Sequence, residues 1–173
     1  MKYTIQIHIL AILLLLTGIT YAQEKIETNL VIGACMPEQY HLGIRSHYIP
    51  NARLDFDLGS DFNDDADGRL YVATVNHAYY LGKVNSKIKR KVWTINTGFS
   101  FLLEETVELK STAGYVNLFL AREIPITKRI FIQPEFGLSY FLFEELVDQN
   151  NYAVRGHRTR IIPKLGLNLI IKI

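Results

Sequence analysis

The segment RTRIIPKLGLNLIIKI, from Arg158 to Ile173, decides how the rest of the chain is interpreted. Its odd-numbered positions, from 159 on, are T, I, P, L, L, L, I and I, and its even-numbered positions, from 158 on, are R, R, I, K, G, N, I and K. Successive side chains of a β-strand point to opposite faces. The segment is therefore predicted to be a strand with one apolar and one polar face.

The same two-residue period recurs along the chain, most clearly in 92–103 and 130–143. Segment 70–81 leaves open which face is apolar, because Asn76 and His77 are adjacent. Eight strands are predicted: Leu30 to Met36, Tyr40 to Tyr48, Ala52 to Leu58, Leu70 to Leu81, Val92 to Leu103, Thr112 to Leu120, Ile130 to Phe143 and Arg158 to Ile173. This pattern predicts an all-β, up-and-down antiparallel barrel.

The links between these strands alternate in character. The links 49–51, 82–90 and 123–128 are expected on the periplasmic side, and 37–39, 60–68, 104–110 and 144–157 on the extracellular side. Longer outer loops and short inner turns are typical of barrels in the outer membrane. The link 144–157 is the longest, and 37–39 is unusually tight for an outer loop.

The first residues have the pattern of an export signal. Lys2 precedes the apolar run 9–16, and Thr20-Tyr21-Ala22 follows, with small residues where a signal peptidase requires them. We expect residues 1–22 to be a signal peptide cleaved after Ala22 and residues 23–173 to form one barrel domain. Cys35 is the only cysteine, so no disulfide within the chain is possible.

A soluble barrel would show the same alternation, with its apolar face inward. Three features favour a transmembrane barrel. Several predicted strands are long, their polar faces carry both signs of charge, and aromatic residues lie near strand ends, as in the girdles of membrane barrels. These aromatic residues are Tyr48, Tyr71, Tyr79, Tyr80, Trp93, Tyr140 and Phe143, and ordinary core packing is the alternative for each of them taken singly.

The charged residues of the polar faces are predicted to form a structural network inside the barrel. They are Arg45, Arg53, Asp55, Asp57, Glu135, Arg158, Arg160 and Lys164. Opposite charges can pair in a narrow lumen, which avoids isolated buried charge. Eight strands enclose just enough room for side chains, so a plugged interior without a channel is expected.

Four stretches carry a resemblance to a known family. They are Tyr21-Ala22-Gln23, the hairpin from Leu42-Gly43-Ile44-Arg45 to Pro50-Asn51, the turn Pro125-Ile126-Thr127 leading into Pro134 to Tyr140, and Leu165 to Leu169. The chain resembles the small outer-membrane-protein β-barrel family, similar in size to the OmpA transmembrane domain and OmpX. The resemblance implies outer-membrane lipids and the barrel-assembly machinery as partners. Family members usually end on an aromatic residue, whereas this chain ends on Ile173.

No nucleophile–base pair, phosphate-binding loop or zinc-type spacing is found in the sequence, and no enzymatic activity or cofactor is expected. His41 and His47 share a strand face but are roughly 20 Å apart at ~3.3 Å per residue, too far to bind one metal ion. The loop from Asn63 to Gly68 matches only the first half of a calcium-binding loop, since Thr74 stands where a glutamate is required. A solvated acidic turn is the alternative.

A net charge of +2 argues against a nucleic-acid partner. The basic stretch 83–91 is interpreted as a solvated run of charge, with contact to anionic lipid headgroups on the periplasmic side as the alternative. The sequence thus predicts a monomeric, non-enzymatic protein of the outer membrane with a structural or surface-interaction role. The alternative is a soluble periplasmic or secreted lipocalin-like barrel that binds an apolar ligand. That alternative would bury Phe99, Leu167 and Leu169 and expose Arg160 and Lys164.

Overall fold

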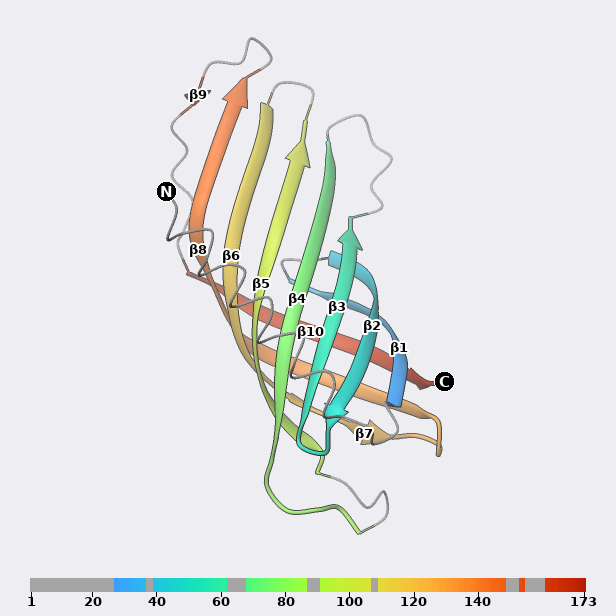
Figure 1. Cartoon of the computed structure of the whole chain (residues 1–173). Coiled ribbons are helices and arrows are strands. Elements are labelled where there is room, and N and C mark those ends of the chain that lie inside the picture. Colours follow the sequence, from blue (N-terminus) through green and yellow to red (C-terminus); the bar gives the residue numbers. More distant parts are fainter. Residues whose placement is uncertain are drawn as a thin grey trace, which may run out of the picture.

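The computed structural model describes residues 27–36, 39–61, 68–86, 91–106, 109–148, 153–154 and 161–173. The predicted signal peptide lies outside these ranges. Within them, no helix is long and apolar enough to cross a membrane. The described chain is built from antiparallel strands that wrap around a single axis (Figure 1).

Eight long strands form the barrel, which confirms the predicted fold. They are β1 (Glu27–Cys35), β2 (Gln39–Ile49), β3 (Ala52–Ser60), β4 (Arg69–Leu81), β5 (Trp93–Glu105), β6 (Leu109–Arg122), β8 (Ile130–Asp148) and β10 (Ile161–Lys172). Each strand pairs with its neighbours in the chain, and β10 pairs with both β8 and β1, so the described sheet closes on itself. Closure leaves no edge along the paired segments. Two short pieces, β7 (Ile124–Pro125) and β9 (Ala153–Val154), add to β8.

The strands beside the outer links are longer than predicted. β5 reaches Glu105, β6 begins at Leu109, and β8 continues past Phe143 to Asp148. The predicted loops 104–110 and 144–157 are therefore partly strand. The reason is pairing: Glu105 lies opposite Lys110, and after a bulge at Gly114/Tyr115 the β6–β8 ladder continues to Leu109 and Asp148.

Apolar side chains predominate on the outward face and polar side chains on the inward face, although two small apolar clusters, around Val72 and Leu102 and around Val31 and Phe131, are also buried. Among the outward side chains, Leu138 is 54% exposed and Leu167 55%, whereas the inward Lys164 is 2% exposed. We call the outward apolar surface the apolar belt; it includes Leu42, Ile44, Leu54, Phe56, Leu58, Val75, Phe99, Phe101, Val116, Leu118, Phe136, Leu138, Leu165 and Leu167. The lipocalin-like alternative is wrong, because its apolar interior would require the opposite faces.

The strand whose faces were undecided in the sequence, β4, points Thr74, Asn76 and Tyr80 inward and His77 outward. The predicted girdle position of Tyr80 is wrong, since only 3% of this residue is exposed and its hydroxyl group lies in the lumen. Its neighbour Tyr79 is exposed on the outer face. The outward His77 forms a 2.5 Å hydrogen bond with the hydroxyl group of Tyr48.

The two ends of the barrel differ. We call the end with the β2–β3, β4–β5 and β6–β8 connections the turn end, and the opposite end the loop end. At the loop end, β4, β5, β6 and β8 extend beyond the ends of β1 and β2 (Figure 1). The barrel wall is therefore high on one side and low beside the β1–β2 turn.

Candidate functional site

The interior of the barrel near the turn end holds four charged side chains. Arg45 and Arg53 come from β2 and β3, Asp55 comes from β3, and Glu123 directly follows β6; each is at most 4% exposed. The Asp55 Oδ1 atom lies 3.0 Å from the Nε atom of Arg45 and 3.1 Å from that of Arg53. The Glu123 Oε1 atom lies 2.7 Å from the Arg53 Nη1 atom and 3.5 Å from the Arg45 Nη1 atom. Two cations thus share two carboxylates, and we call these four residues the ion network.

Neutral side chains complete the hydrogen bonding around the ion network. The Tyr80 hydroxyl group donates to Glu123 over 2.7 Å and accepts a bond from Arg53 over 2.8 Å. The second terminal nitrogen of Arg45 donates to the Gln133 side-chain oxygen at 2.7 Å, and that of Arg53 donates to Asn96 at 3.4 Å. Such additional hydrogen bonds offset part of the unfavourable free energy of moving the charged groups from water into the barrel interior.

A different set of polar side chains lines the wall closer to the loop end. Thr74 and Ser100 join β4 to β5 through a 2.7 Å bond between their hydroxyl groups. The Asn117 amide on β6 donates to Ser100 over 2.7 Å, and Ser139 on β8 donates to the Asn117 oxygen over 2.5 Å. These four residues, all buried, carry no charge, and we call them the hydroxyl–amide ladder.

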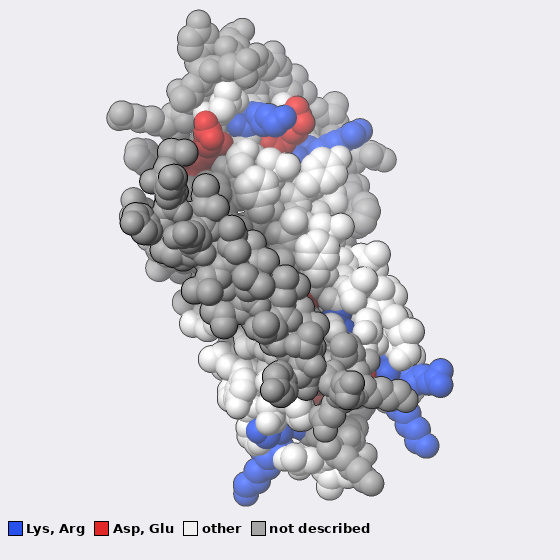
Figure 2. All heavy atoms as spheres, in the orientation of Figure 1, with Lys and Arg blue, Asp and Glu red and all other residues white. Residues whose placement is uncertain are grey.

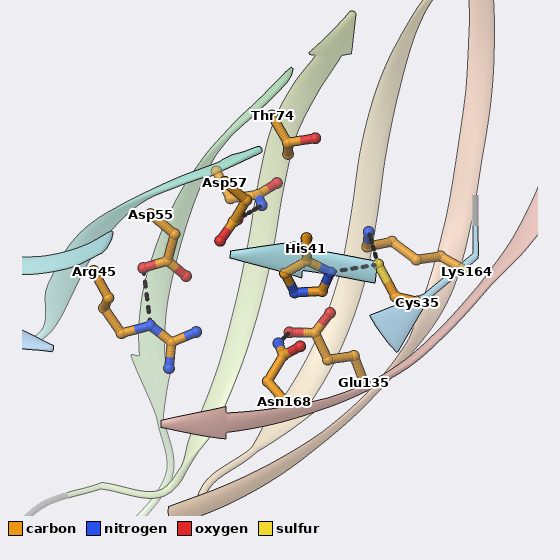
Figure 3. A pocket seen from close by; sticks show the side chains of 10 residues that line it. Cys35, His41, Arg45, Asp55, Asp57, Thr74, Glu135, Lys164 and Asn168 are labelled. Carbon is orange, nitrogen blue, oxygen red and sulfur yellow. Dashed lines mark hydrogen bonds and ion pairs between the residues drawn. The ribbon is translucent and has the colours of Figure 1, made fainter. Parts of the chain in front are cut away.

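A third group lies on the side of the barrel where β1 meets β10 (Figure 3). The Lys164 ammonium group lies 3.5 Å from the Cys35 sulfur atom, and the His41 Nδ1 atom lies 3.7 Å from the same sulfur. Asn168 donates to Glu135 over 2.6 Å. Together with Asp57 and other inward residues, these side chains line a small cavity of about 10 Å³. A cavity of this volume has room for roughly one water molecule.

Inward glycines make room for the large polar side chains. A Cβ atom at Gly43 would collide with the Asp57 carboxylate and lie 2.6 Å from the Phe56 carbonyl oxygen. In the register of the sheet, Gly43 lies directly opposite Asp57. The same opposition of glycine to a larger inward residue holds for Gly33 with Asn168, Gly98 with Asn76, and Gly166 with Cys35.

Six of the eight residues predicted for the lumen lie inside the barrel: Arg45, Arg53, Asp55, Asp57, Glu135 and Lys164. Arg158 and Arg160 lie outside the described residues. Arg45, Arg53 and Asp55 are joined in the ion network, whereas Glu135 and Lys164 belong to the third group. The structural importance of the set stays a prediction.

Sequence reasoning missed Glu123, Tyr80, Gln133 and Asn96. Glu123 falls in the predicted periplasmic link 123–128. The signal that locates it is the alternation along β6, since Tyr115, Asn117, Phe119 and Ala121 all face inward and Glu123 continues their face. For Asn96 and Gln133, alternation within 92–103 and 130–143 predicts a position on the polar face, but the predicted network contains only charged residues.

Within the described ranges, no group of three or more His, Cys, Asp and Glu side chains is arranged to hold a metal ion. His41 and His47 face the same lumen but contact different partners, Cys35 and Tyr80. Of the acidic loop from Asn63 to Gly68, only Gly68 is described, so the calcium hypothesis falls on residues outside the structure.

Solved structures with the same architecture are barrels of the outer membrane. A major outer membrane protein from Thermus thermophilus matches with a TM-score of 0.54 and 11% identity, over 87% of this chain and 100% of that one. CarO from Acinetobacter baumannii matches with a TM-score of 0.50 and 9% identity, over 88% and 99%. The fold is that of an outer-membrane β-barrel. No protein-family model matches the chain, and no curated protein matches it in sequence.

Proposed function

We propose that the protein is a non-enzymatic barrel of the outer membrane, with a structural or surface-interaction role and a lumen closed by its own side chains. The proposal includes export by the signal peptide 1–22, insertion by the barrel-assembly machinery and a monomeric state. The fold shared with outer-membrane proteins supports the location. The apolar belt supports direct contact with lipid, because a soluble barrel would leave that surface in water.

The ion network is the observation that supports a closed lumen. Arg45 on β2 reaches Glu123 at the end of β6 and Gln133 on β8, which lie on other parts of the wall. A side chain that crosses the lumen in this way occupies the path that a solute would take. Opening it would separate paired charges in a low-dielectric interior, which is strongly unfavourable.

The loop end is the part of the molecule available for surface interactions. In the proposed orientation the turn end faces the periplasm and the loop end faces outward. The high wall of β4, β5, β6 and β8 raises the residues around Arg69, Glu105 and Lys110 above the low β1–β2 side. A partner approaching from outside would meet this raised rim first.

Membrane fractionation with a heat-modifiability gel tests the location. We expect the protein in the outer-membrane fraction, migrating faster unheated than boiled. A protein that stays soluble after membranes are removed would contradict the proposal.

Planar-bilayer recording tests the closed lumen. The wild-type barrel is expected to show no unitary conductance. The triple variant Arg45→Ala/Arg53→Ala/Glu123→Ala removes the side chains that cross the lumen and, where heat modifiability shows it folded, is expected to conduct. Glu105→Gln, at the exposed rim, is the matched control and should stay silent. Regular channels from the wild-type protein would overturn the closed lumen while leaving the membrane location intact.

A further inference from the structure

Charge is distributed unequally between the two ends of the barrel. The described turn end carries six cationic residues, which we call the basic arc: Lys83, Lys91, Arg122, Lys128, Arg129 and Lys172. Among the described residues of this end, Glu27 is the acidic residue at the surface, and its carboxylate is 2.8 Å from the Lys172 ammonium group. Glu123, at the same end, is buried in the ion network.

The loop end has the opposite balance. Its described acidic residues are Asp61, Glu104, Glu105, Glu144, Glu145 and Asp148, and its described cations are Arg69 and Lys110. Figure 2 shows this difference among the described atoms in view: red and blue side chains lie side by side at the upper end, whereas blue side chains project from the lower end. Among the described residues, an excess of positive charge is therefore found at the turn end and not at the loop end.

The basic arc follows the border of the apolar belt. Its residues belong to the connection between β4 and β5, the end of β6, the connection between β6 and β8, and the end of β10. Exposed apolar side chains lie among them, with Val84 60% exposed and Ile126 57%. The central carbon of the Arg122 guanidinium group lies 5.2 Å from the centroid of the Trp93 ring, which is itself 41% exposed. An aromatic ring and a cation side by side at the edge of an apolar surface are typical of the membrane–water interface.

We propose that the basic arc binds the phosphates of anionic phospholipid headgroups in the leaflet that surrounds the turn end. This inference rests on the proposed membrane location. Lys and Arg side chains donate several hydrogen bonds to phosphate oxygens. In a membrane, the acyl chains of the phospholipids cover the apolar belt, and their phosphates lie at the height of the basic arc. The apolar and the anionic parts of one phospholipid therefore each contact a complementary surface. A dissolved anion would match only the charged part.

Trp93 makes the proposal measurable, because it is the only tryptophan in the chain and lies within the arc. The full-length exported protein is reconstituted in phosphatidylcholine bilayers. One series contains increasing fractions of dibrominated phosphatidylglycerol, and the other contains increasing fractions of dibrominated phosphatidylcholine. Quenching of Trp93 by each brominated lipid gives the relative association of the two lipids next to the arc. We expect phosphatidylglycerol to be preferred severalfold at low salt, and less at high salt because exposed charges are screened.

Two double variants locate the effect. Lys91→Gln/Arg122→Gln removes the arc cation closest to Trp93 in the sequence and the cation that lies over its ring. We expect this variant to lose most of the preference, since a single basic side chain near an anionic surface contributes up to about fivefold. Arg69→Gln/Lys110→Gln removes two cations of the loop end and should leave the preference unchanged. Arg122→Lys keeps the charge but changes the contact with Trp93, and should retain most of the preference.

The outcomes separate this proposal from the one on which it rests. Failure of the protein to insert, seen as loss of heat modifiability in every bilayer, would overturn the membrane location itself. Insertion with equal quenching by both brominated lipids would overturn the basic arc as a lipid site. A preference abolished by millimolar inorganic phosphate at constant ionic strength would assign the arc to a dissolved anion and also overturn it.

Discussion

The ion network and the hydroxyl–amide ladder stabilise the same lumen in different ways. The ladder joins strands that are already neighbours, because threonine, serine and asparagine side chains reach only the next strand. The ion network joins β2 and β3 to the end of β6 and to β8, because arginine and glutamate side chains are long enough to cross the interior. The comparison teaches that charged side chains in this barrel connect distant strands across the lumen, whereas small neutral side chains connect adjacent strands.

The largest expected effect comes from the ion network. Glu123→Ala leaves Arg45 and Arg53 with only the Asp55 carboxylate from the network, and removing one partner of buried ion pairs costs about 3–5 kcal/mol. We expect the free energy of unfolding to fall by that amount in urea titrations in lipid vesicles, followed by the gel shift between folded and unfolded forms. A loss below about 1 kcal/mol, which is the range for exposed ion pairs, would show that the ion network does not stabilise the barrel more than the hydroxyl–amide ladder.

A smaller loss of stability is expected where an inward glycine lies opposite a large polar side chain. Gly43→Ala forces a Cβ atom against Asp57 and against the backbone oxygen of Phe56, and overpacking of this kind costs about 1–3 kcal/mol. Ala34→Val is the control, since Ala34 is exposed on the outer face of β1 and its added methyl groups meet no lumen residue. Equal stability of both variants in the same urea titration would refute the tight pairing.

Ser100→Ala tests the ladder. Ser100 both bonds Thr74 and accepts from Asn117, yet these neighbours are uncharged, so we expect a loss of about 1 kcal/mol. The decisive readout is the difference from Glu123→Ala in the same urea titration. A loss as large as that of Glu123→Ala would remove the distinction between the two parts.

The smallest effect is expected at the loop-end rim. The Lys110 ammonium group lies 3.7 Å from the Glu105 carboxylate, and both side chains are more than half exposed. Lys110→Gln should therefore change the free energy of unfolding by less than about 1 kcal/mol. Its small effect should shrink further at high salt, whereas the loss from Glu123→Ala should persist because buried charges are screened less. A salt-independent loss of several kcal/mol at Lys110 would contradict this assignment.

The barrel could be predicted because its signal is local. Alternation within 158–173, 92–103 and 130–143 identifies strands and their polar faces without knowledge of their neighbours. The same alternation, within 40–48, 52–58 and 158–173, predicts Arg45, Asp57 and Lys164 on inward faces, where the structure has them. Strand ends were less accurate, because the extensions of β5, β6 and β8 depend on pairing with a neighbouring strand rather than on their own composition.

The contacts inside the lumen could not be predicted, since they depend on the register of all eight strands. Arg53 and Glu123 are separated by 70 positions in the chain, and no period within one strand indicates that they meet. Tyr80 shows the same limit: adjacent tyrosines at 79 and 80 must face opposite sides, but the sequence of β4 does not reveal which one faces inward.

The opposition of inward glycines to large polar residues has an evolutionary consequence. Where position 43 holds a larger residue in a homologous chain, position 57 has to hold a smaller one, and the same exchange applies to positions 33 and 168 and to positions 98 and 76. Lumens of this type are expected to diverge by paired replacements across a strand boundary. A library of single substitutions would therefore underestimate how many different interiors this barrel can accept.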